Sequence, residues 1–403
     1  MTCGLLGRKL SHSYSSAIHS LLADYDYTLF EKEPEELEDF IRHGSWDGLN
    51  VTIPYKKAAA ALCDELSDLA KELGSVNTLV RRADGTVFGD NTDAYGFRVM
   101  ANSLPVDYMG KKALVLGSGG ASVTVQAVLK QLGCRVVVVS RSGENNYENL
   151  HLHQDAAILV NTTPVGMYPH NGESPVDLQN LSNLQAVLDV VYNPVRTKLM
   201  LDAEEMGIPC VSGLLMLVAQ AARACEIWTG KAISFETIEE IRKTIGSSME
   251  NIILIGMPGS GKSTVGKFLA AETGREFVDS DEELVKKIGN IPDFFAQYGE
   301  EAFRKAETEV LAELGKASGL VIATGGGVVT REENYPLLHQ NGKIFWLRRD
   351  LDKLPTHGRP LSQKEGVAAL YEKRKPLYQR FADRIVDNNG SLHDTCGEIL
   401  NAK

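Results

Sequence analysis

Two glycine-rich phosphate-binding loops of different kinds lie far apart in this 403-residue chain. The first, GSGGAS at 117–122, follows the apolar run KALVLG, and the second, GMPGSGKST at 256–264, follows NIILIG. The first pattern is typical of a dinucleotide-binding turn and the second of a Walker A loop, and each needs its own strand–loop–helix unit. The simplest interpretation is two enzymes on one polypeptide, one using a nicotinamide cofactor and one using ATP.

Composition narrows the class of protein. The length suits two or three domains, and 43% apolar with 24% charged residues is ordinary for a soluble globular protein. A formal charge of −11 argues against nucleic acid or an anionic membrane as a partner. The six cysteines form no CxxC pair, and neither a signal peptide nor an apolar run long enough to span a bilayer is present. These features predict a cytoplasmic enzyme with small-molecule substrates, and they leave an oligomer open.

The segment TIGSSMEN at 244–251 is the predicted boundary between the two halves. The preceding IEEIRKTI has the pattern of an amphipathic helix, and the following NIILIG that of a buried strand. Residues 246–250 are therefore predicted to be a short linker. Before it, CGLLG, YTLFEK and GLNVT are predicted strands, and the mostly apolar run 213–230 is a predicted helix that returns to pack on the first lobe.

The first glycine-rich loop lies between two predicted strands, with a helix after it, and this context strengthens a weak motif. Its glycines would let a pyrophosphate approach the backbone, and Ser122 replaces the usual third glycine. Arg141, between two serines, stands where an NAD-specific fold usually has an acidic residue. Because the arginine fork suits a 2′-phosphate, the sequence predicts NADP. The predicted cofactor contacts are Gly117, Ser118, Gly119, Gly120, Ala121, Ser140, Arg141, Ser142, Thr162, Val191 and Gly213.

Residues 3–245 resemble the shikimate dehydrogenase family. The likeness is carried, in order, by LSHSYSS, GLNVTIPYK, SVNTL, GDNTDAYGF, GSGGAS, VNTTPVGM, LDVVYNP and GLLMLVAQAA. The resemblance implies a substrate-binding domain at 1–95 plus 206–245 and a Rossmann-type NADP domain at 96–205. It implies a hydroxy-acid site made of Ser13, Ser15, Asn50, Thr52, Lys56, Asn77, Asp93, Tyr192 and Gln220, with Lys56 and Asp93 as the catalytic pair. Leu215 departs from the family, which usually has glycine there, and is expected to reshape the nicotinamide pocket.

The second loop is a complete Walker A motif. Backbone N–H groups of such a loop cradle the β-phosphate, Lys262 reaches the β- and γ-oxygens, and Ser263 binds Mg²⁺. The predicted ATP contacts are Gly256, Pro258, Gly259, Ser260, Gly261, Lys262, Ser263 and Thr264. The motif alone does not name the acceptor.

Residues 251–390 resemble shikimate kinase through FVDSDEEL, FRKAE, ATGGGVV, GRPLS and EKRKPLY. The resemblance implies a P-loop kinase domain at 251–403, in which a parallel sheet is flanked by helices. It implies that Asp279 helps to hold Mg²⁺, that Asp281 contacts the acceptor hydroxyls and that Arg359, on a lid, lies between the acceptor and the transferring phosphate. The implied catalytic residues of this half are Asp281, Lys262 and Arg359. The implied shikimate contacts are Asp281, Arg304, Gly325, Gly326, Gly327 and Arg374.

Together the two halves predict a bifunctional α/β enzyme of the shikimate pathway. Its first half would reduce 3-dehydroshikimate with NADPH, and its second would phosphorylate shikimate with ATP and Mg²⁺. Two alternatives stay open: a first half that prefers quinate, and a chain in which one half is a non-catalytic binding module.

Overall fold

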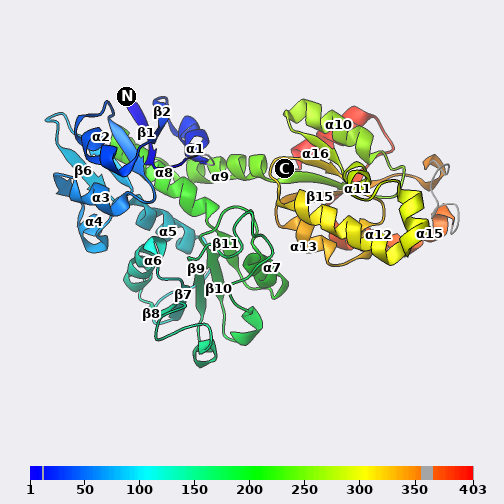
Figure 1. The fold of residues 1–403 in the computed structure, drawn as a ribbon, viewed down its shortest axis with the longest axis horizontal. Helices are drawn as coiled ribbons and strands as arrows, with labels where there is room; N and C mark the ends of the chain where they lie inside the picture. The colour runs from blue at the N-terminus through cyan, green and yellow to red at the C-terminus, as the bar shows by residue number, and fades with distance from the viewer. Residues whose placement is uncertain (11–12, 355–365, 403) are drawn as a thin grey trace. The chain divides into compact units, whose positions relative to one another are not determined.

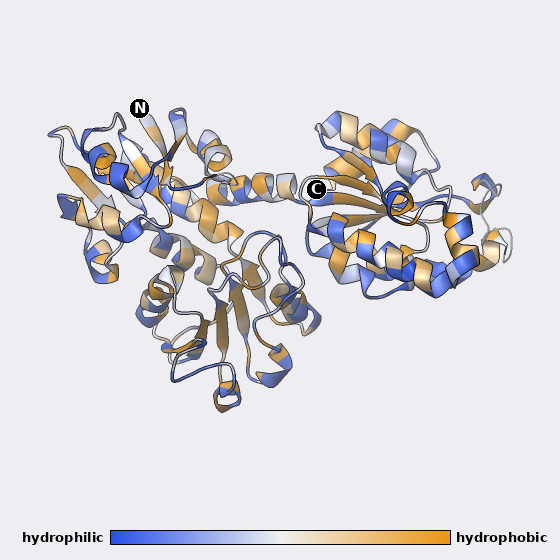
Figure 2. Ribbon diagram, viewed as in Figure 1, coloured by the Kyte–Doolittle hydropathy of each residue, from blue (hydrophilic) through white to orange (hydrophobic). Residues whose placement is uncertain are grey.

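The computed structural model describes residues 1–10, 13–354 and 366–402. The chain divides into two compact units. Unit 1 holds residues 1–167, 173–192 and 199–245, and unit 2 holds 168–172, 193–198 and 246–403. Three sheets with flanking helices make up this α/β fold (Figure 1). In Figure 2 the strands are largely hydrophobic while the helices carry both kinds of residue, as expected where helices cover buried sheets.

The first sheet of unit 1 is mixed and has the order β2-β1-β3-β5-β6-β4. The early strands fall where the sequence predicts them. Its strands are β1 (Thr2–Gly7), β2 (Asp26–Glu31), β3 (Gly48–Val51), β4 (Glu65–Leu66), β5 (Thr78–Arg81) and β6 (Val87–Asp90). The helices of this lobe are α1 (Ser15–Leu22), α2 (Leu37–His43), α3 (Lys56–Ala61), α4 (Asp68–Leu73), α5 (Thr92–Asn102) and α8 (Leu214–Thr229). The predicted return of the 213–230 helix is confirmed, since α8 packs on α5, α1 and β5.

The second sheet of unit 1 is wholly parallel, with the order β11-β10-β9-β7-β8. It contains β7 (Lys112–Leu116), β8 (Arg135–Val139), β9 (Ile158–Asn161), β10 (Ala186–Asp189) and β11 (Cys210–Ser212), with α6 (Gly120–Gln131) and α7 (Lys198–Glu205). Alternate residues of β7 enter two different cores: Ala113 and Val115 enter one, and Leu114 and Leu116 the other. Figure 1 shows α6 on one side of this sheet and α7 on the other. Such a sheet, buried on both faces, accounts for the continuous apolar runs in the sequence.

Unit 2 contains a parallel sheet of order β13-β14-β12-β15-β16. Its elements are β12 (Asn251–Ile255), α10 (Lys262–Thr273), β13 (Phe277–Asp279), α11 (Ser280–Ile288), α12 (Ile291–Lys316), β14 (Val321–Ala323), α13 (Asn334–His339), β15 (Gly342–Arg348), α15 (Val367–Phe381), β16 (Arg384–Asp387) and α16 (Leu392–Asn401). Helices α10 and α16 cover one face, and α12, α13 and α15 the other (Figure 1). Helix α12 is interrupted at Gly299, whose φ of +80° is left-handed.

The segment 246–250, predicted as a linker, is helical up to Met249. It forms the last turn of α9 (Phe235–Met249), and β12 begins two residues later at Asn251. Ile238, Ile241, Ile245 and Met249 are all buried. Their spacing continues one apolar helix face through the glycine and serines. The boundary between the halves is therefore built without a loop.

Candidate active sites

A cavity of about 500 Å³ lies in unit 1 near the carboxyl ends of β1 and β3. Ligands of α/β sheets bind at such strand ends. All nine residues predicted for the hydroxy-acid site line this cavity, although they come from six different segments of the chain: Ser13, Ser15, Asn50, Thr52, Lys56, Asn77, Asp93, Tyr192 and Gln220. Most of them are polar and short, which suits a ligand that carries several hydroxyl groups.

An ion pair stands in the wall of this cavity. Lys56 is the first residue of α3, and its Nζ lies 2.5 Å from Oδ2 of Asp93, in the first turn of α5. The other carboxylate oxygen of Asp93 accepts a hydrogen bond from Nδ2 of Asn77 at 2.9 Å. Because each oxygen has its own partner, the carboxylate is fixed, and it in turn holds the ammonium group at the cavity.

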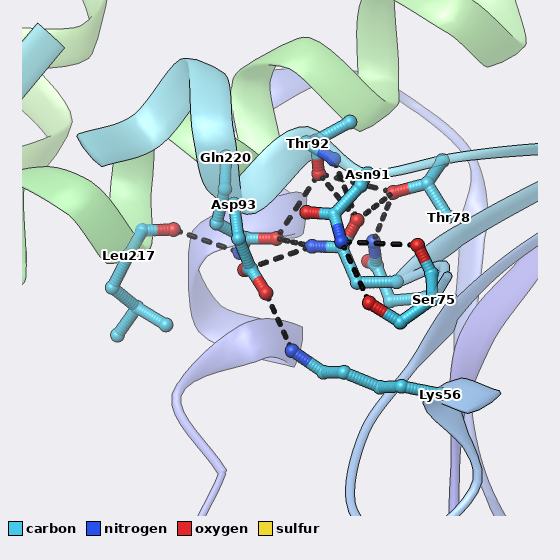
Figure 3. Close-up of polar contacts among 10 residues, drawn as sticks. Lys56, Ser75, Thr78, Asn91, Thr92, Asp93, Leu217 and Gln220 are labelled. Carbon is cyan, nitrogen blue, oxygen red and sulfur yellow. Dashed lines mark hydrogen bonds and ion pairs between the residues drawn. The ribbon is translucent and has the colours of Figure 1, made fainter. Parts of the chain in front are cut away.

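A buried polar network supports this pair (Figure 3). Oδ1 of Asn77 accepts from the Thr92 N–H at 2.7 Å, and its Nδ2 also donates to Oε1 of Gln220 at 3.3 Å. Thr78 and Thr92 share a hydrogen bond of 3.1 Å between their hydroxyls. Neither threonine was predicted as a site residue, although Thr78 directly follows Asn77 in SVNTL and Thr92 directly precedes Asp93 in GDNTD.

Helices α5 and α8, which carry Asp93 and Gln220, cross closely at Gly96. A methyl group at Gly96 would lie 2.5 Å from the Met216 carbonyl oxygen. Only glycine permits this approach without moving one helix. Leu215, on α8, is buried but is not among the residues that line the cavity, whereas Met216 and Leu217 are. The leucine therefore does not reshape this cavity directly.

The predicted dinucleotide loop joins β7 to the N-terminus of α6. Gly117 has a φ of +100°, and nothing lies within 4 Å of a methyl group placed at Gly119 or Gly120. This open backbone at a helix N-terminus fits a pyrophosphate. The Ser122 hydroxyl is buried and donates to the Gly117 carbonyl at 2.7 Å, so it holds the loop where the motif usually has glycine.

The other predicted cofactor contacts surround this loop. Thr162 donates from Oγ1 to the Leu116 carbonyl at 2.6 Å, and the Gly213 N–H donates to the Val191 carbonyl at 3.1 Å. Ala121 and Gly213 also line the cavity, so the loop and the cavity adjoin. Exposed Arg141 follows β8, with Ser140 and Ser142 beside it.

The Walker A loop connects β12 to α10. Gly256, Gly259 and Gly261 have left-handed φ values of +147°, +84° and +96°. Nζ of Lys262 donates to the carbonyls of Gly256 and Met257 at 2.9 and 3.0 Å, so the lysine folds over its own loop. Asn388, which the sequence analysis missed, donates from Nδ2 to the Ser260 carbonyl at 2.6 Å. The glycine-rich loop, with the Lys262 side chain folded over it, fits the phosphates of a nucleoside triphosphate.

The two predicted aspartates have distinct positions. Asp279 ends β13 and caps α11, because its Oδ1 accepts from the Asp281 N–H at 3.0 Å. Its Oδ2 accepts from the Ser263 hydroxyl at 2.7 Å, so the two residues predicted to hold Mg²⁺ touch. Asp281 belongs to the helix and faces Gly325, where a methyl group would lie 2.7 Å from Oδ1. Although Asp281 is exposed to solvent, desolvation by nearby protein raises its pKa, and the charge of Asp279 adds to this effect.

Two buried arginines meet the Gly325–Gly327 turn. Arg374 donates from Nη1 to the Gly326 carbonyl at 2.9 Å, and a methyl group at Gly327 would collide with the Arg304 guanidinium. Arg304 also pairs with buried Glu307 at 2.7 Å. Burial raises the pKa of Glu307, and the charge of Arg304 opposes that shift. Glu307 was not predicted as a site residue, although it lies one helical turn after Arg304 in FRKAE. Tyr378, which donates to the Gly326 carbonyl at 2.6 Å, was not predicted either.

Pro258 packs against Gly326, and Thr264 continues the first turn of α10. Arg359 lies outside the described residues.

Within the described ranges, no helix is both long and apolar enough to cross a membrane. In the same part of the chain, no group of three or more His, Cys, Asp and Glu side chains forms a metal site.

The comparisons with known proteins cover both halves. Residues 5–79 match the shikimate dehydrogenase substrate binding domain, and 213–241 match the shikimate 5'-dehydrogenase C-terminal domain. The shikimate dehydrogenase (NADP(+)) of Methanopyrus kandleri is 38% identical over 271 residues, which cover 93% of its length and 59% of this chain. The chain belongs to the shikimate dehydrogenase family. A second relative, from Clostridium perfringens, is 35% identical, with 96% of its length and 59% of this chain covered.

Solved structures agree with the fold of this dehydrogenase part. A chorismate mutase/shikimate 5-dehydrogenase fusion protein from Clostridium acetobutylicum is 37% identical, with a TM-score of 0.58 and coverage of 61% of this chain and 97% of that one. The Thermus thermophilus shikimate 5-dehydrogenase in complex with NADP(H) and shikimate is 31% identical, with a TM-score of 0.55 and coverage of 60% and 99%. The dehydrogenase half is thus an NADP-dependent oxidoreductase.

The family model for shikimate kinase matches residues 258–402. The predicted fusion of a dehydrogenase with a kinase is therefore confirmed, as are both enzyme classes and the cofactors NADP(H), ATP and Mg²⁺. The chain is a bifunctional enzyme of the shikimate pathway.

Proposed function

We propose that the chain catalyses two consecutive reactions. The dehydrogenase half reduces 3-dehydroshikimate to shikimate, and the kinase half phosphorylates the 3-hydroxyl of shikimate. The observation that carries this proposal is that all nine predicted substrate residues line one cavity with the Lys56–Asp93 pair in its wall. The match to shikimate kinase supports the second reaction, because the substrate in the name of that family is the product proposed for the first reaction.

In the dehydrogenase, NADPH supplies the hydride. The Lys56 ammonium then donates a proton to the oxygen that was the ketone, and Asp93 holds the ammonium in place. Ser13 and Ser15 suit the carboxylate of the substrate, and the amides of Asn50, Asn77 and Gln220 suit its ring hydroxyls.

In the kinase, ATP with Mg²⁺ supplies the phosphoryl group. Arg304 and Arg374 would bind the acceptor carboxylate beside Gly325–Gly327, because guanidinium groups pair with carboxylates in fixed geometry. Asp281 orients the attacking hydroxyl. Ser263 and Asp279 would hold Mg²⁺ together with phosphate oxygens and water. Nucleotide-binding sites usually bind Mg²⁺ in this way, with only one or two protein side chains.

Arg141 is proposed to bind the 2′-phosphate of NADP. We expect Arg141→Asp to raise the KM for NADP by about tenfold or more, because the variant loses a charge-assisted hydrogen bond to the 2′-phosphate. The KM for NAD should stay within about twofold, because NAD lacks this phosphate. Arg135→Asp, at the opposite end of β8, is the matched control and should change neither value. Equal changes for both cofactors in Arg141→Asp would show that this arginine does not recognise the 2′-phosphate.

We infer that the two halves fold separately, with lobes at 1–95 plus 206–245 and 96–205, a boundary at 246–250 and a kinase at 251–403. Met249 is buried in unit 2, its carbonyl accepts from the Gly319 N–H, and the Ser247 carbonyl accepts from Arg275. Fragments 1–245 and 246–403 should therefore each be active.

A 250–403 fragment should have a free energy of unfolding about 2 kcal/mol lower than that of the 246–403 fragment, since it lacks Met249. Denaturant titration of both kinase fragments tests this expectation, and equal stabilities would contradict it.

Steady-state assays of each half with shikimate and quinate, and with NADP and NAD, test the proposed function. We expect a higher kcat/KM for shikimate and NADP. A quinate preference would support the first alternative, and one inactive half would support the second.

The six cysteines are all free thiols, which supports a location in the reducing cytoplasm.

A further inference from the structure

An aromatic stack lies behind the wall of the dehydrogenase cavity. The His19 ring is fully buried and stacks on Tyr27, with ring centroids 4.1 Å apart and an angle of 11°. The His19 ring also stacks on Trp228, with centroids 5.2 Å apart and an angle of 26°. Trp228 is anchored by a hydrogen bond from Nε1 to the Leu79 carbonyl at 2.9 Å. The position of the Tyr27 ring is therefore fixed by two neighbours that do not line the cavity.

The hydroxyl of Tyr27 contacts side chains that do line the cavity. It donates to Oδ1 of Asn50 at 2.7 Å. Burial raises the pKa of Tyr27, and a hydrogen bond with Ser15 opposes that shift. One tyrosine thus connects two predicted substrate contacts.

This contact sets the orientation of the Asn50 amide. With its oxygen held by Tyr27, the amide nitrogen lies 3.4 Å from Oγ1 of Thr78. A carboxamide nitrogen has two donor hydrogens, so one remains for a ligand in the cavity that Asn50 lines. The stack brings no charge near the amide, because burial lowers the pKa of His19 to about 3, against a smaller opposing effect of Asn50.

We propose that Tyr27 is a positioning residue for substrate recognition, which holds Asn50 with its amide nitrogen toward the cavity. The site then donates to a ring hydroxyl oxygen at this position instead of accepting from it. This role rests on the proposed function, in which Asn50 contacts the hydroxylated ring. Tyr27 itself does not touch the substrate and acts through Asn50 and Ser15.

The test compares two tyrosines of the same cluster. Tyr25 contacts His19 as well, through its hydroxyl, which lies 2.5 Å from Nδ1 of the histidine. Within the described structure, Tyr25 makes no hydrogen bond with Asn50. We expect Tyr27→Phe to raise the KM for shikimate about three- to tenfold, the effect of one lost hydrogen bond. The kcat, the KM for NADP and the kinase activity should stay within about twofold, and Tyr25→Phe should leave all four within about twofold.

A double-mutant cycle then shows whether the effect passes through Asn50. In an Asn50→Ala background, most of the effect of Tyr27→Phe on the KM should disappear. Tyr27→Met fills the same space without a hydroxyl and should reproduce the rise in KM. It replaces Tyr27→Phe in the test if the phenylalanine variant does not fold. An unchanged KM in both Tyr27 variants, an equal rise in Tyr25→Phe, or full additivity with Asn50→Ala would overturn the proposal. Failure of the wild-type chain to oxidise shikimate would instead refute the proposed function.

Discussion

Lys56→Ala is expected to lower the kcat of the dehydrogenase by about 10²- to 10⁴-fold, the usual contribution of a positioned general acid or base. The ammonium of Lys56 lies in the cavity wall and is held 2.5 Å from Asp93, so the variant removes the proton donor and leaves the carboxylate without its cation. The kinase activity should be unchanged. Oxidation of shikimate and phosphorylation of shikimate, both measured on the same preparation, give the comparison.

Lys57→Ala is the matched control. Lys57 is the next residue of α3, is exposed and does not line the cavity, so its removal should leave both activities within about twofold. A Lys56→Ala enzyme that oxidises shikimate at the wild-type rate would remove the lysine from the reaction. Equal losses in both variants would point to damage to α3 instead of lost proton transfer.

Asp281→Asn is expected to lower the kcat of the kinase by about 10²-fold or more while ATP binding survives. The substitution keeps the size of the side chain but removes the charge that orients the acceptor hydroxyl. Because desolvation raises the pKa of Asp281, its active ionised form is lost on acidification at a higher pH than for an ordinary aspartate. The wild-type kcat should therefore fall on the acid side, and the variant should lack that step.

Two comparisons separate the roles of the neighbouring aspartates. Asp279→Asn should act through Mg²⁺ and recover in part at raised magnesium, since Asp279 contacts Ser263. Glu282→Gln, exposed on the same turn of α11, should change nothing. Full kinase activity in Asp281→Asn would exclude it from the catalytic residues, and magnesium rescue of that variant would mean that the two aspartates exchange roles.

The parts that the sequence predicts well depend on local patterns. Each phosphate loop follows a buried strand and precedes a helix, and glycines supply the left-handed turns at Gly117 and Gly256. The hydroxy-acid site is predictable for a different reason, because its residues belong to family motifs that stay together in the cavity.

The parts that the sequence does not reveal depend on contacts between distant segments. Tyr27 meets Asn50 because β2 and β3 both pair with β1, a register that no local pattern encodes. Gly96 is a plain helix residue until α8 packs on it. In the 246–250 segment the glycine and serines favour a linker, but the buried face that ends at Met249 outweighs that preference.

The central claim is that one chain performs both reactions in order. The most direct measurement supplies purified full-length enzyme with 3-dehydroshikimate, NADPH, ATP and Mg²⁺, and follows NADPH oxidation, ADP release and the products. We expect shikimate 3-phosphate to form with one ADP released for each NADPH oxidised, ADP release to require NADPH, and shikimate to accumulate when ATP is omitted. NADPH oxidation without any ADP release, or ADP release that does not depend on NADPH, would contradict the account.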